Sequence, residues 1–415
     1  MKVGIVYPRA NVDTVPSLVG AVEVLAEAGH EVHVFTYAVA GQRLATFTSS
    51  RVRVHTLGVE GLAEHSTAGL RHAIKRASWL PGVARAPLIR TYSVLGAGLA
   101  TGSRLAARAR SAVAEREQAF DCVIGVDPDG LALAHALAHG APLAYLSLEL
   151  LLSYELVTPV DRQLKAQERD LSQQARFIIV QDEARGRLLT EDNGLDWERV
   201  VLVPNAPFGP ARRRASRYWH DRFQLPAGAR VVLHSGSLGA WTGIEDIVTS
   251  TSHWPDAWVL VIHTRYNAES SSYVDGLRRR SERDRVFFSL KPVPPQEYDP
   301  LIDGADVGIA FYVPDPGSSF TQRNVQTIGL SSGKLAYYLR AGLPVIVNRA
   351  SSIGEVADSE GFGVAVDDAG GIPRALDRVA NEYDGFSAAS LAFFDSRLNF
   401  RAAFSEVLRR LELLG

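Results

Sequence analysis

The stretch 327–348 constrains this chain most, because it combines a loop, a short helix and a buried strand in one continuous pattern. Ser331 or Ser332 fits the N-cap position, where a side-chain oxygen accepts a hydrogen bond from an otherwise unpaired backbone N–H. Apolar residues recur at helical spacing from Leu335 onward, and Gly342 suits the left-handed position that ends a helix. The apolar run that follows the glycine predicts a buried strand.

Lys334 is the unusual residue of this stretch, because it lies in the first turn of the expected helix. A cation at that place opposes the helix dipole by about 0.3–1 kcal/mol. A bound anion would reverse this effect, since helix N-termini hold phosphates through free N–H groups and a lysine adds a point charge. Two interpretations follow: Lys334 points into solvent, or it faces an anionic ligand.

Length and composition favour a soluble, cytoplasmic protein of two domains. A chain of 415 residues has room for two cores, and a net charge of -2 gives no overall attraction to nucleic acid or to a membrane. The single cysteine, Cys122, excludes an internal disulfide framework and fits a reducing compartment. The apolar run after Met1 is too short for a signal peptide, and no run reaches the roughly eighteen residues of a membrane span. No His/Cys cluster has zinc-ligand spacing, so no metal site is expected.

Apolar strand-like runs alternate with helical patterns in both halves of the chain, which predicts parallel sheets with right-handed crossovers. The runs lie at 2–7, 31–36, 51–55, 121–126, 143–147, 177–180 and 200–203, and then at 230–234, 258–263, 286–289, 307–311, 343–347 and 363–366. The segment 204–214 has the proline-rich, charged composition of a linker. We therefore expect an α/β protein with two doubly wound Rossmann-like domains, facing a ligand cleft between them at the carboxyl ends of their strands. The expected domains are 1–205 and 206–390, with a C-terminal helix at 391–415 that packs back toward the N-terminal domain.

Residues 71–110 interrupt this pattern with eight lysine or arginine residues and no acidic residue, interleaved with apolar side chains such as Trp79. A basic amphipathic segment of this kind can lie on anionic lipid, which predicts peripheral contact at the inner face of a membrane. The alternatives are a solvated helix face or a basic rim for an anionic substrate.

Two glycine-containing turns carry the chemistry of the second half. The turn that starts at Gly236 follows a strand and opens a helix, but its spacing and the basic residue Arg265 after the next strand disfavour a nicotinamide dinucleotide site. The turn that starts at Gly329 lacks P-loop spacing. A diphosphate held between the first turn and Lys334 is the simplest interpretation of both.

Taken in order, these motifs resemble a family 4 glycosyltransferase of the GT-B fold, of the bacterial glycosyl transferase group 1 type. In the second half the resemblance rests on Gly236-Ser-Leu, Thr242-Gly, Ser331-Ser-Gly-Lys-Leu and Ala341-Gly-Leu-Pro-Val-Ile. In the first half it rests on Lys2-Val-Gly-Ile-Val-Tyr-Pro, Gly29-His-Glu-Val, Tyr145-Leu-Ser-Leu-Glu, Ile179-Val-Gln-Asp-Glu and Val203-Pro-Asn-Ala.

The resemblance implies an enzyme that transfers a hexose-like sugar from a nucleotide-diphosphate donor with retention at the anomeric carbon. The acceptor is expected to be a glycan, a lipid-linked molecule or a small molecule. No cofactor and no obligatory metal are expected, and nucleic acid is not an expected partner.

The resemblance also implies a role for individual residues. The expected donor-binding residues are Gly236, Ser237, Leu238, Thr242, Arg265, Lys291, Ser331, Ser332, Lys334 and Tyr337. Glu149 lies near the place where the family often has an acidic or histidine side chain against the transferred sugar, and Asp127 is a second catalytic candidate. Arg9 and Asn11 are expected on the acceptor side. The alternative for Glu149 is a buried structural carboxylate bonded to the backbone.

The chain departs from the family pattern in its charged residues. Ser237 and Thr242 stand where the family commonly has an Arg and Lys pair, and the two family glutamates align with about Gly329 and with Tyr337. These departures keep two alternatives open beside the transferase. One is a non-catalytic partner subunit that binds a sugar nucleotide, and the other is a GT-B-type sugar-nucleotide epimerase or hydrolase.

Overall fold

The computed structural model describes residues 1–10, 12–39, 44–60, 119–282 and 284–414, and these form two compact units. Unit 1 comprises Met1–Leu202 and Phe404–Gly415, and unit 2 comprises Val203–Ala403. Asn11 and the basic segment 71–110 lie outside the described residues. Within the described part of the chain, no helix has both the length and the apolar character needed to cross a membrane.

Unit 1 is built on a seven-stranded sheet in which each strand pairs in parallel with its neighbours. In sheet order the strands are β3 (Val52–Glu60), β2 (Glu31–Val39), β1 (Lys2–Val6), β4 (Cys122–Val126), β5 (Leu143–Leu146), β6 (Phe177–Val180) and β7 (Val200–Leu202). The central strands are buried along their whole length, as expected for a parallel sheet that is covered on both faces.

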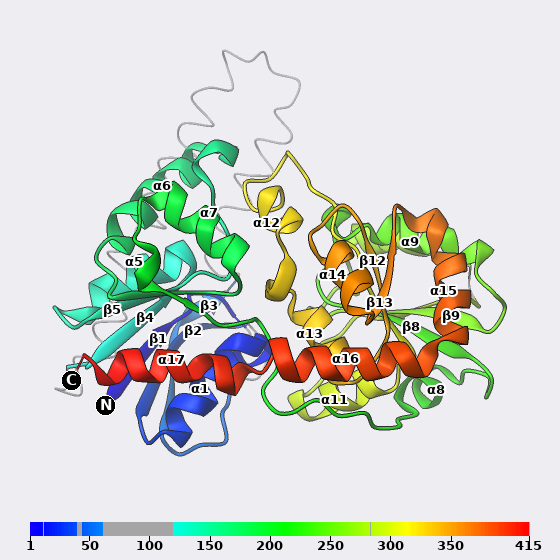
Figure 1. Cartoon of the computed structure of the whole chain (residues 1–415), viewed down its shortest axis with the longest axis horizontal. Helices are drawn as coiled ribbons and strands as arrows, with labels where there is room; N and C mark the ends of the chain where they lie inside the picture. Colours follow the sequence, from blue (N-terminus) through cyan, green and yellow to red (C-terminus); the bar gives the residue numbers. More distant parts are fainter. Residues whose placement is uncertain (11, 40–43, 61–118, 283, 415) are drawn as a thin grey trace, which may run out of the picture. The chain divides into compact units, whose positions relative to one another are not determined.

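The helices of unit 1 cover the two faces of this sheet. They are α1 (Pro16–Glu27), α5 (Asp127–Ala138), α6 (Pro159–Ser172), α7 (Glu183–Asn193) and α17 (Phe400–Glu412), of which α17 belongs to unit 1 from Phe404 onward. Figure 1 shows α5, α6 and α7 on one face and α1 on the other. The sequence pattern places the helix after β4 at Leu131, whereas α5 begins earlier because Pro128 suits the first helical turn.

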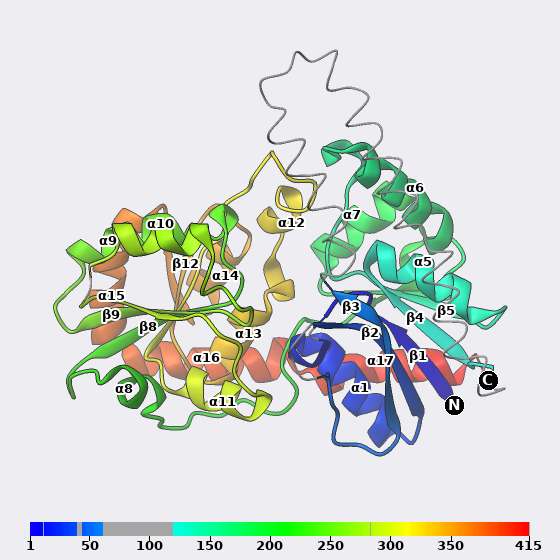
Figure 2. The same cartoon turned by 180° about the vertical axis from the view of Figure 1, so that it is seen from behind.

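Unit 2 is built on a six-stranded parallel sheet with the same kind of winding. Its strands, in sheet order, are β10 (Val286–Ser289), β9 (Trp258–His263), β8 (Arg230–Ser235), β11 (Val307–Ala310), β12 (Val345–Asn348) and β13 (Gly363–Val366). Its helices are α8 (Tyr218–Phe223), α9 (Ile244–Ser250), α10 (Ser272–Arg280), α11 (Pro295–Asp303), α12 (Arg323–Gln326), α13 (Gly333–Arg340), α14 (Ile353–Glu360), α15 (Ile372–Asn381) and α16 (Tyr383–Arg397). Figure 2 shows α8, α11 and α13 on one face of the sheet and α9 and α10 on the other.

The order of the strands fixes where a ligand is expected in each unit. In unit 1 the winding reverses between β1 and β4, and in unit 2 it reverses between β8 and β11. Ligands of doubly wound sheets bind beyond the carboxyl ends of the strands at such a reversal. The expected fold class of two doubly wound parallel sheets is confirmed, and the loops after these four strands become the candidate sites.

Helix α13 carries the sequence stretch that opened the analysis, and its ends form as the residues predict. The Ser332 hydroxyl accepts the N–H of Leu335 at 3.2 Å as the N-cap. At the other end Gly342 has a φ of 66°, and the N–H of Leu343 donates to the carbonyl of Tyr338 at 2.9 Å. The strand that follows begins at Val345, later than the apolar pattern indicates, because the turn occupies the residues before it.

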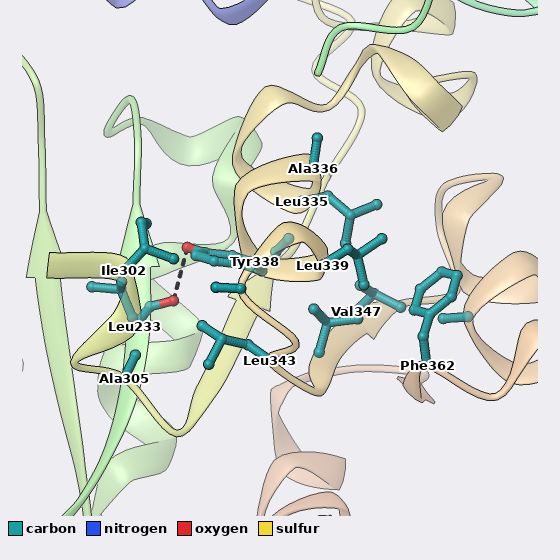
Figure 3. Close-up of a cluster of buried hydrophobic side chains, with 14 of the residues drawn as sticks. Leu233, Ile302, Ala305, Leu335, Ala336, Tyr338, Leu339, Leu343, Val347 and Phe362 are labelled. Atoms are coloured by element: carbon teal, nitrogen blue, oxygen red, sulfur yellow. Dashed lines mark hydrogen bonds between the residues drawn. The ribbon is translucent and has the colours of Figure 1, made fainter. Parts of the chain in front are cut away.

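Tyr338 anchors α13 on the sheet. Its hydroxyl donates to the carbonyl of Leu233 at 2.9 Å and accepts the N–H of Ser235 at 2.7 Å, so the helix is bonded to the carboxyl end of β8 (Figure 3). The ring lies against the backbone of Gly308 in β11, where a Cβ atom would be 2.2 Å from the nearest ring carbon. Only glycine at that position lets the tyrosine approach the sheet.

Replacement of Gly308 by alanine is expected to destabilise unit 2, because the added methyl overlaps the Tyr338 ring. The overpacking cost is about 1–3 kcal/mol in the free energy of unfolding, measured by thermal or urea unfolding. Gly385→Ala in α16 is the matched control, since nothing lies within 4 Å of its Cβ position and alanine is the better helix former. Equal stability of the Gly308→Ala variant and the wild type would contradict this packing.

Candidate active site

The glycine turn after β8 lies beside Lys334. Gly236 begins the turn, and its N–H donates to the carbonyl of His263 at 3.0 Å, which ties the turn to the end of β9. A Cβ atom on Gly236 would lie 3.8 Å from Cδ of Lys334, so the backbone of the turn is in contact range of the lysine stem. The structure therefore brings together the two sequence features from which a diphosphate site was predicted.

The Lys334 amine is buried and unpaired. The residue as a whole is half-buried, but Nζ has no exposed surface and no hydrogen-bond partner among the described residues. Nζ lies over the aromatic ring of Tyr312, at 4.7 Å from the ring centroid, which is a cation–π distance. Burial lowers the pKa of Lys334 from its usual value to about 7. In this structure the amine does not point into solvent.

Tyr312 links the loop after β11 to the start of α13. Its hydroxyl contacts the hydroxyl of Ser332, the N-cap of the helix. Its backbone N–H and carbonyl form two hydrogen bonds of 2.8 Å with the side-chain amide of Asn348 at the end of β12. Tyr312 and Asn348 were missed from the sequence, because their roles depend on which strand ends are neighbours in the folded sheet.

His234 is a third residue that the sequence did not identify. It is fully buried near the end of β8, and its Nε2 lies 3.3 Å from the carbonyl oxygen of Ser237 in the glycine turn. Its Nδ1 has no partner among the described residues. Burial first, and then the charge of Lys334, hold the pKa of His234 well below its usual value. The sequence feature that could have identified His234 is its place as a polar residue near the end of the otherwise apolar strand β8.

Tyr337 extends the site along α13. Its ring packs edge to face against Tyr298 at 4.7 Å, and the Tyr298 hydroxyl lies 3.0 Å from the hydroxyl of Ser235 at the end of β8. Burial raises the pKa of both tyrosines, and the nearby charge of Arg265 partly opposes this in each case. Arg265 and Tyr337 are thus close to one another, as the donor assignment requires.

Other donor candidates are already engaged elsewhere. Lys291 is exposed and forms a 3.1 Å ion pair with Glu269. Thr242 is buried, and its hydroxyl donates to the carbonyl of Gly239 at 2.7 Å. The N–H of Ser331 donates to the carbonyl of Ile328 at 2.8 Å, so it is not free for a phosphate. Leu238 packs against the apolar core on the α9 face of the sheet.

In unit 1, Asp127 organises the switch point after β4. It is fully buried and has a φ of 59°, a left-handed conformation that Asp tolerates better than most residues. Its Oδ1 accepts the N–H groups of Leu148 and Glu149 at 2.8 and 2.9 Å, and its Oδ2 forms a 3.2 Å ion pair with Nη1 of Arg9. With both carboxylate oxygens engaged, Asp127 is better suited to position the loop after β5 than to accept a proton in the reaction.

Arg9 lies between two carboxylates, with Nη2 at 3.6 Å from Asp129 in addition to its contact with Asp127. The charge of Asp127 is the main reason why the pKa of Arg9 lies above its usual value, while burial acts in the opposite direction. The side chain remains 39% exposed, so part of the guanidinium faces solvent at the carboxyl end of β1.

Glu149 lies at the tip of the loop that Asp127 holds. Near it, the buried guanidinium of Arg185 donates to the carbonyl of Leu148 at 2.7 Å and to Oε1 of Gln181 at 2.8 Å. Burial lowers the pKa of Arg185, and the charge of Glu149 is the largest opposing influence. Glu149 is half-buried, and the guanidinium of Arg185 is the positive charge near it.

Residues 16–206 match the family described as a glycosyl transferase 4-like domain. Three solved structures are similar over nearly the whole chain. Sucrose-phosphate synthase from Thermosynechococcus elongatus has a TM-score of 0.69 at 15% identity, with 100% of both chains covered. HepE from Anabaena, in complex with UDP-glucose, has a TM-score of 0.68 at 13% identity, also with 100% of both chains covered. WaaG, a glycosyltransferase involved in lipopolysaccharide biosynthesis, has a TM-score of 0.62 at 12% identity, with 98% of this chain and 99% of that chain covered.

No curated protein matches the sequence. The likeness to the solved structures shows the fold, and it confirms the expected GT-B architecture of two Rossmann-like domains.

Replacement of Lys334 by methionine is expected to stabilise the ligand-free protein in a pH-dependent way. The folded-state pKa of about 7 lies below the unfolded value of about 10.5, so folding releases a proton between these values. The wild type therefore bears the full cost of the buried charge below about pH 7 and loses that cost as the pH rises. The gain in Tm of Lys334→Met should be largest near pH 6 and should shrink toward pH 10.

The control for this measurement is Lys291→Met, which removes an exposed, ion-paired amine and should give no comparable trend. A Tm difference for Lys334→Met that does not change with pH would contradict the burial of an unpaired amine.

Proposed function

We propose that this chain, a GT-B glycosyltransferase whose residues 16–206 form a glycosyl transferase 4-like domain, transfers a sugar from a nucleotide-diphosphate donor with retention at the anomeric carbon. The acceptor is a glycan, a lipid-linked molecule or a small molecule, and the reaction needs no obligatory metal. The resemblance of the motifs to family 4 glycosyltransferases is supported by the match of residues 16–206 to a glycosyl transferase 4-like domain, and the GT-B fold is shared with the similar solved structures.

The observation that carries the donor proposal is the buried amine of Lys334. A charged group without a partner inside a protein is costly, and a bound anion offsets that cost. Lys334 lies in the first turn of α13, where the helix dipole also favours negative charge, and the glycine turn at Gly236 leaves the backbone accessible beside it. A diphosphate satisfies all three features at once.

The same group has a role in the chemistry. When the sugar leaves, negative charge develops on the diphosphate, and a preorganised cation in a water-poor site stabilises that charge. Lys334 supplies this cation, and Arg265 supplies a second positive charge close to Tyr337. HepE was solved with UDP-glucose, with UDP and glucose, and with UDP. Uridine diphosphate sugars are therefore the first donors to test.

We assign different roles to the two carboxylates of unit 1. Glu149 is proposed as the acidic side chain that acts on the transferred sugar, because it is half-buried at a loop tip. Asp127 is proposed as a positioning residue, because both of its oxygens already hold the protein. Arg9 and Asn11 stay proposed for the acceptor. Contact of residues 71–110 with anionic lipid and a cytoplasmic location also stay predictions.

The donor proposal is tested by binding of UDP-glucose and other nucleotide sugars to the full chain, followed by calorimetry and by thermal shift. Lys334→Met should weaken binding by about 2–4 kcal/mol, because it removes one partner of a buried charge pair. Lys2→Met, in unit 1 at the amino end of β1, is the matched control and should bind like the wild type. A folded wild-type protein that binds none of these nucleotides would refute the donor site.

Turnover separates the transferase from the two alternatives. Release of nucleotide that depends on the acceptor supports transfer, whereas donor conversion without acceptor supports an epimerase or hydrolase. Donor binding without any conversion supports a non-catalytic partner subunit. Retention is read from the anomeric configuration of the product by NMR.

The two carboxylates are expected to respond differently to mutation. Glu149→Gln should lower kcat by about 10²-fold or more with little change in Tm or donor affinity, as for loss of a group that acts in the reaction. Asp127→Asn should lower Tm, because it weakens the acceptor for two backbone N–H groups and leaves Arg9 without its main partner. Loss of kcat without loss of Tm in Asp127→Asn would instead favour a direct catalytic role for that residue.

A further inference from the structure

In the part of the chain that the structure describes, no carboxylate pairs with the amine of Lys334. Among the described residues Nζ has no hydrogen-bond or ion-pair partner, and burial alone accounts for its lowered pKa. The contact it does make is with the ring of Tyr312, which carries no charge to balance it. The protonation state of Lys334 therefore depends on the burial of its amine and not on an ion pair.

Four buried titratable side chains on the elements around Lys334 are neutral near pH 7. From β8, His234 is uncharged because burial and Lys334 itself keep its pKa well below the usual value. From α13 and α11, Tyr337, Tyr338 and Tyr298 have pKa values raised by burial and stay protonated. The Tyr312 hydroxyl, from the loop after β11, contacts Ser332. The charges that act on Tyr337 are those of Arg265 and Arg340, which have the same sign as an ammonium group, and that of Asp299. The Asp299 carboxylate forms ion pairs with Arg212 and Arg340.

We propose that binding of a diphosphate at this site is accompanied by uptake of one proton by Lys334. The inference rests on the proposed donor site and adds to it a charge change that the ligand brings about. A dianion placed beside Nζ favours the charged form of the amine. The proton comes from the buffer and adds to the nitrogen lone pair, and no covalent bond to the ligand forms or breaks.

This coupling makes donor affinity depend on pH in a defined direction. With the free amine titrating at about 7, the site is already charged at about pH 6, and binding there takes up almost no proton. At about pH 8.5 the free amine is mostly neutral, and binding takes up almost one proton. The Kd should therefore change little below about pH 7, and above it the rise should approach about tenfold for each pH unit.

The test is calorimetric titration of the full chain with UDP-glucose in buffers of different ionisation enthalpy. This probe has no phosphate monoester, whose second pKa near about 6 would add its own proton. The slope of the observed enthalpy against the buffer enthalpy gives the number of protons taken up. We expect a value near zero at about pH 6 and near one at about pH 8.5, with the Kd rising as stated.

Lys334→Arg is the matched control, because a guanidinium stays charged throughout this pH range. It should bind UDP-glucose with no proton uptake and with a Kd that does not change with pH. His234→Gln keeps a side-chain N–H for the Ser237 carbonyl and should retain the uptake of the wild type. Should Lys334→Arg fail to fold, the wild-type titration together with His234→Gln still decides the question.

Three outcomes would overturn the inference. Tight binding by the wild type with no proton uptake at any pH removes the coupling and leaves the donor site intact. Loss of the uptake in His234→Gln with unchanged binding assigns the proton to the histidine instead. Absence of any binding by the folded wild type removes the donor site and the inference with it.

Discussion

The hydrogen bonds of the Tyr338 hydroxyl determine the donor half of the candidate site. One group accepts the N–H of Ser235 and donates to the carbonyl of Leu233, so the helix that carries Lys334 is bonded to the strand that ends at the glycine turn. The bare backbone of Gly308 gives the ring its place against the sheet. Because α13 cannot shift along β8 without breaking these bonds, the lysine stem stays beside Gly236. The position of the amine is thus a consequence of core packing one turn further along the helix.

In unit 1 a carboxylate, that of Asp127, has the role that the Tyr338 phenol has in unit 2. Asp127 takes a left-handed conformation at the start of α5 and receives two N–H groups from the loop after β5. Arg9, which follows β1, neutralises the carboxylate from the other side of the strand reversal. In both units, then, one buried side chain bonds the backbone of a neighbouring strand end. The loop that carries Glu149 and the helix that carries Lys334 are thus held in place by contacts with neighbouring strand ends.

The difference between local and long-range contacts explains which features could be predicted from the sequence. Ser332, Gly342 and the apolar strand runs act through neighbours a few residues away, so the helix, its ends and the two wound sheets could be predicted from local pattern. The start of α5 was placed too late, because the apolar helical pattern begins at Leu131, whereas the helix begins in the turn around Pro128, where the distant N–H groups of Leu148 and Glu149 hold Asp127. Tyr312 could not be assigned to the site, since its contacts with Ser332 and Asn348 join segments that are far apart in the chain. The proximity of His234 to Lys334 likewise depends on the folded sheet. The ion pair of Lys291 with Glu269 was hidden for the same reason.

The departures from the family pattern remove positive charge from the glycine turn. Ser237 and Thr242 replace an Arg and Lys pair, and Thr242 is buried with its hydroxyl bonded to Gly239, so the glycine turn itself contributes no positive charge. In the described part of the site, the cations that face the proposed diphosphate are Lys334 and, near Tyr337, Arg265. A site with several cations is charged at any physiological pH. A site in which a buried amine supplies part of the positive charge changes its charge near neutrality, and its affinity for an anion is then expected to follow the protonation of that amine.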